Sequence, residues 1–313
     1  SGPNAGWLNR IFMAVTGSHT GFIDVYSFGV LSLVTALYAF PYIFVFTSDA
    51  LDRVSSEMEE AANILGAGSF HTIFRVTLPL VTPAILGGAI VVFLDTVALF
   101  GTPAVIALPA RIRIMTLQLW QYFEFPVRAE VAAAYAIPLI GITLLLFWTQ
   151  RLILGRKSYV ALTGKGGSRT LTPLGRWRWL VLGYALLVVS LAVIFPYAAL
   201  VKAAFSKAWG LGFTLGNVTL DNFERLLSDE GARNTIIHSF TYSAGAGCVA
   251  VALALLVAYV VNRKLMPGGS LLTLLCMAPL VIPGIVLGIG FYAAFAAPPV
   301  ALYGTALILI LGY

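Results

Sequence analysis

Long runs of apolar residues dominate this sequence and restrict what it can fold into. Each run has roughly the 20 residues that an α-helix needs to cross the hydrocarbon core of a bilayer. The composition agrees, because 59% of the residues are hydrophobic and only 10% are charged. We therefore predict an all-α fold, a polytopic bundle of membrane helices. The predicted spans are residues 22–46, 84–108, 131–148, 180–205, 236–261 and 270–295, with a further apolar run from about 301.

The basic residues predict which side each loop lies on. A net charge of +6 is compatible with nucleic-acid binding, but most Lys and Arg residues lie beside the spans, where positive-inside topology explains them better. We therefore expect the lipid bilayer, and no nucleic acid, as a partner. Seven Lys or Arg residues and no acid lie between residues 151 and 178, which predicts a cytoplasmic linker. Counting spans from this linker puts residues 49–82 on the same side, and 107–130 and 206–235 outside.

Residues 55–79 form the one long polar stretch between two spans. Ser56 and Glu59 have the spacing of a capping box, and the acids of this first turn suit the positive end of a helix dipole. Gly66 can adopt the left-handed conformation that ends a helix. Ser69 to Val76 then predicts a second short helix. On this local chemistry alone, an ordinary amphipathic loop resting on the bilayer is an equally good interpretation.

The same stretch carries a spaced pattern that resembles a known motif. It is similar to the EAA loop of permease subunits of ATP-binding-cassette (ABC) importers, whose usual form is E-A-A-x3-G-x9-I-x-L-P. Val76 stands where that family usually has Ile. The matching residues are Glu60, Ala61, Ala62, Gly66, Leu78 and Pro79.

This resemblance implies a MetI-like ABC permease fold in the bacterial inner membrane. In that family the loop docks into a groove on an ATPase subunit, which gives Glu60, Ala61, Ala62, Gly66, Val76, Leu78 and Pro79 a coupling role. The implied partners are two copies of a cytoplasmic ATP-binding subunit and a periplasmic solute-binding protein. ATP then binds and is hydrolysed on the partner subunits, so that this chain is expected to carry no cofactor and to be no enzyme.

The chain further resembles part of a fused permease with two such units, as in the iron(III)-type permeases. Residues 1–155 are then the later part of a first unit, 156–178 a basic cytoplasmic linker, and 179–313 the early part of a second unit, whose last span is cut. Gly29 and Tyr38, like Gly304 and Tyr313, are nine residues apart, which is weak support for a repeat. The absence of an initiator Met also suggests a fragment, and residues 1–22 are predicted to be a loop.

Iron(III) is the leading substrate on this likeness, with 2-aminoethylphosphonate, thiamine and polyamines as alternatives. An ion-coupled secondary transporter is the rival class, although Asp95 is the only acid deep inside a predicted span, since Asp24 lies at the very start of another. A membrane-embedded enzyme would need a cluster of acids or histidines, which the sequence does not suggest.

A few residues within the spans are candidates for the translocation path. Asp95 is the strongest, because an ionisable group in a membrane is costly. A hydrogen bond between helices explains Asp95 equally well. Tyr38 and Pro283 are further candidates, although packing explains each of them better. His19, His71 and His238 are scattered, so no metal site is predicted.

Overall fold

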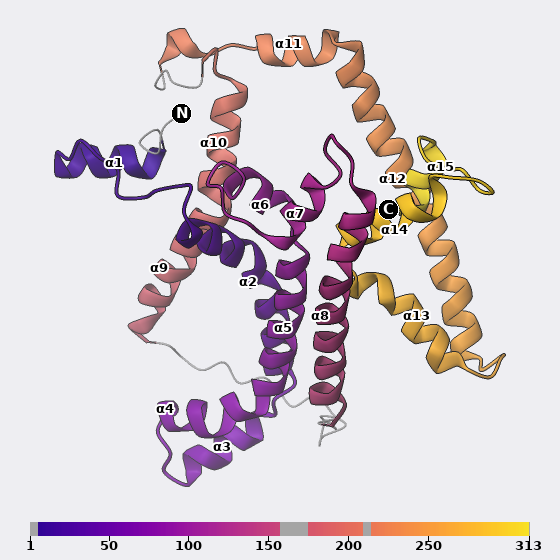
Figure 1. Cartoon of the computed structure of the whole chain (residues 1–313). Helices are drawn as coiled ribbons and strands as arrows, with labels where there is room; N and C mark the ends of the chain where they lie inside the picture. Colours follow the sequence, from indigo (N-terminus) through magenta and orange to yellow (C-terminus); the bar gives the residue numbers. More distant parts are fainter. Residues whose placement is uncertain (1–5, 157–174, 209–213, 313) are drawn as a thin grey trace.

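The computed structural model describes residues 6–156, 175–208 and 214–312 (Figure 1). Within these ranges every regular element is helical, and the one β feature is an isolated bridge between Ser206 and Val218. The predicted all-α fold is thus confirmed for the described residues. Most of the predicted 156–178 linker lies outside them, as does Tyr313.

The first half of the chain begins with a short helix and then builds three long ones. Its α-helices are α1 (Trp7–Thr16), α2 (Phe28–Asp52), α3 (Ser56–Ile64), α4 (Ser69–Thr72), α5 (Leu78–Ala98), α6 (Gly101–Ile106), α7 (Met115–Gln121) and α8 (Ala129–Arg156), with a π-helical segment, η2 (Ile73–Thr77), between α4 and α5.

The second half is likewise helical. It contains α9 (Trp177–Val189), the π-helical η3 (Ser190–Ile194), α10 (Phe195–Ala204), the 3₁₀ turn η4 (Leu215–Asn217), α11 (Asp221–Ser228), α12 (Glu230–Asn262), α13 (Gly269–Val281), α14 (Gly284–Phe295) and α15 (Ala306–Gly312).

Five helices among the described residues are long and apolar enough to cross a membrane, and each corresponds to a predicted span. They are Phe28–Asp52, Phe70–Ala98, Ala129–Gln150, Trp177–Ala204 and Glu230–Asn262.

The first two spans lie elsewhere along the sequence than hydropathy predicts. α2 begins after Ser27, whose hydroxyl accepts a hydrogen bond from the Val30 N–H at 3.3 Å, and so starts six residues later than predicted. The second span begins earlier, because helix continues from the preceding loop directly into α5. It also ends earlier. Leu99 is extended, and its carbonyl accepts the buried Thr116 hydroxyl at 3.0 Å.

The predicted span 270–295 is interrupted. α13 ends at Val281, and Pro283, which is fully buried, is the N-cap residue of α14. A proline has no N–H to continue the ladder of hydrogen bonds, so the chain breaks here. Interrupted helices persist in membranes where protein surrounds the break.

The prediction of a loop over residues 1–22 is wrong in part. Trp7–Thr16 forms α1, which ends at Gly17 in the left-handed conformation, with the Gly17 N–H bonded to the Met13 carbonyl at 2.9 Å. The ring of Phe12 packs against that of Phe22, with centroids 4.6 Å apart. Gly, Pro and Asn led to the prediction of a loop, whereas the helix is stabilised by contacts with residues that follow it in the sequence.

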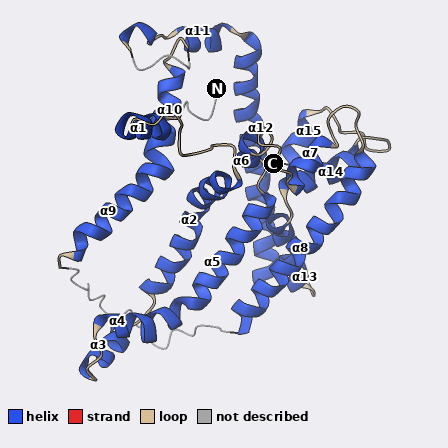
Figure 2. Ribbon diagram, turned by 60° about the vertical axis from the view of Figure 1, so that its left-hand side comes forward, coloured by secondary structure: helices blue, strands red, loops and turns tan. Residues whose placement is uncertain are grey.

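α2, α5 and α8 run side by side, with α5 between the other two (Figure 2). Gly88 allows the close approach of α5 to α2. A Cβ atom at this position would lie 3.2 Å from Cβ of Phe46 and 3.5 Å from Cα of Ile43. Small residues at helix contacts are the usual route to tight packing in membranes, where lipid is as apolar as the side chains.

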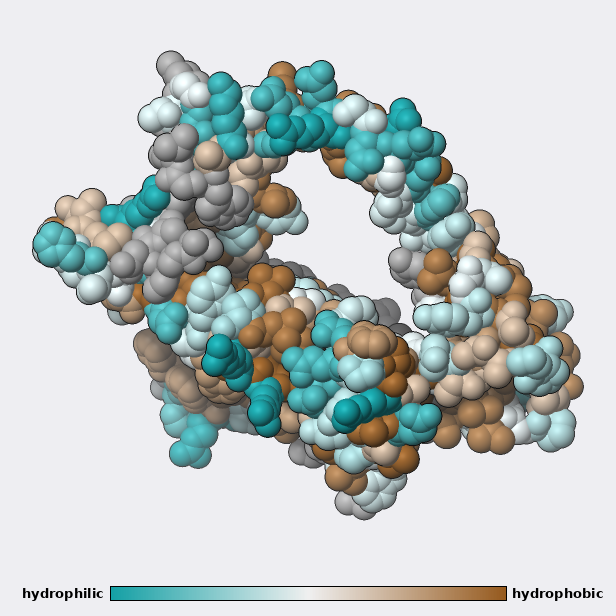
Figure 3. All heavy atoms as spheres, turned by 45° about the horizontal axis from the view of Figure 1, so that its top comes forward, coloured by the Kyte–Doolittle hydropathy of each residue, from teal (hydrophilic) through white to brown (hydrophobic). Residues whose placement is uncertain are grey.

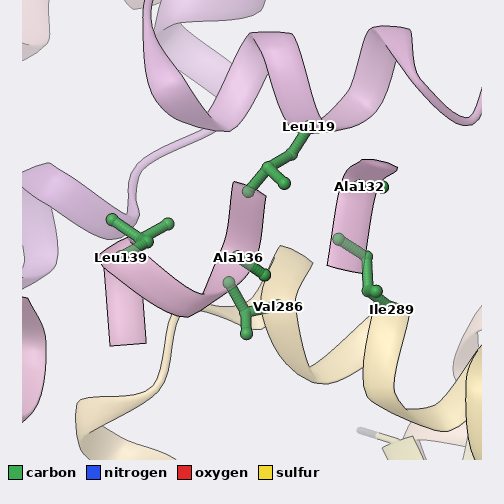
Figure 4. Close-up of a cluster of buried hydrophobic side chains, with 6 residues drawn as sticks. All are labelled: Leu119, Ala132, Ala136, Leu139, Val286 and Ile289. Carbon is green, nitrogen blue, oxygen red and sulfur yellow. The ribbon is translucent and has the colours of Figure 1, made fainter. Parts of the chain in front are cut away.

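A buried cluster joins the first half to the second. Leu119 of α7 and three residues of α8 pack against two residues of α14 (Figure 4). The edge of the Phe123 ring also meets Tyr292, with centroids 5.4 Å apart. The interrupted helix is therefore attached to α8. The clustered residues are Leu119, Ala132, Ala136, Leu139, Val286 and Ile289.

The connections between the long helices gather at two ends of the molecule. α3 and α4 lie at one end, which we call the loop end, together with the start of α9 and the turn between α12 and α13 (Figure 1). α1, α6, α7 and α11 lie toward the other, which we call the far end. This grouping is the one that the span count predicts. In Figure 3, which brings the far end forward, hydrophilic side chains gather along α11 and the start of α12.

Candidate functional site

The loop between α2 and α5 is a helix, a corner and a second helical segment. α3 begins after Ser55, whose hydroxyl accepts the Glu57 N–H at 3.3 Å. The predicted capping pair of Ser56 and Glu59 is therefore wrong, because the residue that caps the helix is Ser55 and not Ser56. Adjacent serines compete for the cap, and the glutamate is used elsewhere.

Gly66 forms the corner as predicted. Its φ angle is +84°, in the left-handed region that favours glycine. The Gly66 N–H bonds to the Asn63 carbonyl at 3.0 Å, and the Ala67 N–H bonds to the Ala62 carbonyl at 3.0 Å. This pair of bonds is a Schellman motif, which closes α3 and satisfies its last carbonyls. The direction of the chain after α3 thus depends on a conformation that other residues rarely adopt.

The second helical segment does not stand alone. α4, η2 and α5 follow one another without a break, so that one helix runs from Phe70 to Ala98. The prediction of a separate short helix over Ser69–Val76 is therefore wrong about where that helix ends, because it continues into α5. Pro79 lacks an N–H for the carbonyl one turn back, and the π-helical segment lies directly before it. No break in the helix therefore separates the second part of the loop from α5.

A hydrogen bond ties α3 to this continuous helix. The Thr77 hydroxyl donates to Oε1 of Glu59 at 2.7 Å, across 18 residues of sequence. Thr77 is buried and Glu59 is half-buried, so this hydrogen bond contributes about 1 kcal/mol. Sequence reasoning missed this role of Glu59 and Thr77. Glu59 directly precedes the motif and Thr77 lies within it, between Val76 and Leu78, but no spacing rule predicts their pairing.

The loop presents a strongly exposed apolar surface at its tip. The exposed fractions are 85% for Ile64, 87% for Leu65, 75% for Phe70 and 62% for Phe74. Glu60 is also exposed, beside these side chains in the sequence. Large exposed apolar side chains on a polar loop are typical of a surface that binds another protein or the membrane.

The remaining motif residues differ in how far their side chains are exposed. Ala61, Leu78 and Pro79 are exposed, whereas Ala62 and Val76 are half-buried. The structure therefore brings the motif together in one loop, with its first residues on α3 and its last ones at the start of α5.

The candidate path residues fall into two groups. One carboxylate oxygen of Asp95, on α5, is buried and has no hydrogen-bond partner among the described residues. Tyr38, on α2, is close enough to Asp95 to interact with it electrostatically. Pro283, which precedes α14, lies near a different face of α5 from the one that carries Asp95. Val97 packs against the cluster that includes Ile282 and Ile285, and two residues along a helix point in nearly opposite directions.

Comparison with known proteins identifies the class. Residues 6–159 match the family described as the binding-protein-dependent transport system inner membrane component. Through these residues the chain belongs to that family. With its five apolar helices, it is a multi-pass protein of the bacterial inner membrane.

Curated relatives extend the similarity to nearly all of the chain. It is 28% identical over 308 residues to a ferric transport system permease protein FbpB of Actinobacillus pleuropneumoniae, which covers 94% of this chain and 43% of the relative. It is also 28% identical over 297 residues to a putative ferric transport system permease protein FbpB 1 of Haemophilus influenzae, covering 92% and 45%. The chain thus spans about half the length of these relatives.

A shorter similarity reaches other transport systems. The molybdenum transport system permease protein ModB of Escherichia coli is 28% identical over 115 residues, which are 36% of this chain and 50% of the relative. No solved structure matched the chain.

Proposed function

We propose that this chain is the membrane-spanning permease part of an ATP-driven ABC importer. The observation that carries this proposal is the loop over residues 55–79. It has the family's spaced motif, an exposed apolar tip, a fixed glycine corner and a helical connection into a span. A docking loop needs each of these features, because it must bind a partner and pass a displacement to the spans.

The proposed mechanism is alternating access. Two cytoplasmic ATP-binding subunits engage this loop and a second, equivalent loop, and ATP-driven closure of these subunits moves both. The displacement of α3 passes through the Glu59–Thr77 hydrogen bond and the continuous helix to α5. α5 packs on α2 and α8, so the three helices tilt together between inward-open and outward-open states. Hydrolysis of ATP belongs to the partner subunits.

The proposed substrate is iron(III), delivered by a periplasmic solute-binding protein. Support comes from the two ferric permease relatives, each similar over more than nine-tenths of this chain. 2-Aminoethylphosphonate, thiamine and polyamines remain the alternatives. The candidate substrates are distinguished by uptake of each radiolabelled solute into proteoliposomes. These contain the full-length polypeptide, its ATPase subunits and its binding protein. We expect uptake of ferric iron, and uptake of one of the others instead would overturn the assignment of substrate.

We further propose that Asp95 and Tyr38 line the translocation path, and that Pro283 contributes by fixing the break before α14. A buried carboxylate oxygen without a partner suits a polar solute or cation that passes transiently. The Asp95→Asn variant, which keeps the shape but removes the charge, should reduce ATP-dependent uptake at least about tenfold. Normal uptake with normal amounts of protein would remove Asp95 from the path.

Asp95 is also the one observation that favours the rival class of ion-coupled transporter. The same proteoliposomes distinguish the two classes. An ABC importer requires ATP and continues when ion gradients are dissipated, whereas a secondary transporter requires the gradient and continues without ATP.

A further inference from the structure

A cavity of about 470 Å³ lies where α1, α2 and α10 meet, and neither the residues of the 55–79 loop nor Asp95 line it. It lies between the two halves of the chain, since α2 belongs to the first half and α10 to the second. We propose that it binds one molecule of an anionic phospholipid, with an acyl chain between α2 and α10 and the phosphate beside Arg10 and Lys202.

The walls of the cavity are apolar along the helices. α2 contributes Leu33, Val34 and Leu37, and the opposite wall includes Leu191 and Phe195. These residues belong to helices that cross the membrane. Water is a poor occupant of an apolar space, whereas an acyl chain of the surrounding bilayer matches it.

The charged residues that line the cavity indicate that its occupant carries a negative charge. Arg10 and Lys202 both line it, and no Asp or Glu is among the described residues that do. Lys202 lies in the last turn of α10, and α1 lies beside that end of the bundle (Figure 1). Cationic side chains above an apolar cleft complement a lipid with a negatively charged headgroup, and the contribution is about fivefold in affinity for each Lys or Arg.

The position of Arg10 is fixed by its neighbour. Asn9 is buried, donates from Nδ2 to the Ile23 carbonyl at 2.7 Å and accepts the Ile23 N–H at 3.0 Å. A side chain at Gly21 would collide with Asn9, at a distance of 2.5 Å. α1 is thus attached to the segment that leads into α2, so the cation is held at the cavity rather than on a free terminal arm.

The test compares phosphatidylglycerol with phosphatidylcholine of the same acyl chains. Delipidated full-length protein is mixed with each lipid, and retained lipid is measured by native mass spectrometry. We expect phosphatidylglycerol to bind about 30-fold more tightly, because two cations contribute. The double variant Arg10→Gln/Lys202→Gln should lose this preference. The matched control Arg225→Gln/Arg233→Gln removes two exposed cations of α11 and α12 and should keep it.

A second variant tests the acyl-chain site. Ala199 lines the cavity, and Ala199→Phe should fill it and reduce retention of both lipids without unfolding the protein. Inorganic phosphate should not compete, since the acyl chain provides much of the affinity. Equal binding of the two lipids, an unchanged preference in the Arg10/Lys202 variant, or a cross-link from position 199 to another segment of polypeptide would each overturn the proposal.

Discussion

The helices α2, α5 and α8 differ sharply from α9, α10 and α12 in how they meet their neighbours. The first three contain buried residues, and a glycine brings α5 against α2. α9 and α10 contain no buried residue, and Ala246 is the one buried residue described in α12. Lipid is as apolar as Leu, so exposure of α9 and α12 to a bilayer costs little. What distinguishes the first group is close packing, and the loop is attached to that group.

This difference teaches where a displacement of the loop can go. α5 is continuous with the loop and packs on both α2 and α8, and α8 packs on α14. A movement therefore has a packed route into the centre of the molecule. α9 and α12 offer no comparable route among the described residues.

The strongest way to break the comparison is to enlarge a glycine in each group. Gly88→Leu forces a branched side chain into the contact with Phe46 and should destabilise the protein by about 3 kcal/mol, because the core is overpacked. Gly183→Leu is the matched control on α9, where an added Cβ meets nothing within 4 Å. Thermal unfolding in detergent measures both. Equal effects would mean that the two groups do not differ in packing.

A smaller effect is expected when a packed side chain is shortened. Leu139 on α8 is fully buried in the cluster with α14, and Leu139→Ala should cost about 2 kcal/mol through the cavity that it leaves. Leu187→Ala removes the same atoms from α9, where the side chain is 56% exposed, and should change stability by less than about 0.5 kcal/mol. A large loss at Leu187 would show that α9 is covered by something that packs as tightly as α14.

The smallest effect in this series concerns the hydrogen bond between Glu59 of α3 and Thr77 of the continuous helix. Thr77→Val keeps the shape of the side chain and removes the hydrogen bond to Glu59, so ATP-dependent uptake should fall several-fold while stability falls by only about 1 kcal/mol. Glu57→Gln, on the exposed side of the same helix, is the control and should transport normally. If Thr77→Val also transports normally, the Glu59–Thr77 hydrogen bond plays no part in coupling.

Much of this architecture follows from sequence because long apolar runs must become helices in a bilayer. The identity of the spans and the corner at Gly66 are predictable in this way. The boundaries are not. α5 begins earlier than its hydropathy indicates because helix from the loop runs into it, and α2 begins at Phe28 because Ser27 caps it.

The remaining features depend on residues far apart in the sequence. Glu59 looks like half of a capping box, yet it pairs with Thr77, which local spacing cannot reveal. The break at Pro283 is stable because α7 and α8 cover its surroundings, and the nearness of Tyr38 to Asp95 depends on how α2 packs against α5. The exposed apolar tip of the loop could have been inferred from Phe70 and Phe74, since a polar loop has little internal surface to bury them.

The central claim is that the corner at Gly66 couples ATP hydrolysis to movement of the spans. The most direct measurement is the number of solute molecules transported per ATP hydrolysed by Gly66→Pro in proteoliposomes with the ATPase subunits and binding protein. Proline cannot adopt a φ of +84°, so we predict a variant that inserts and binds the ATPase but hydrolyses ATP without transport. Gly68→Ala, at a neighbouring position without positive φ, should remain coupled. A normal ratio of transport to hydrolysis in Gly66→Pro would contradict the claim.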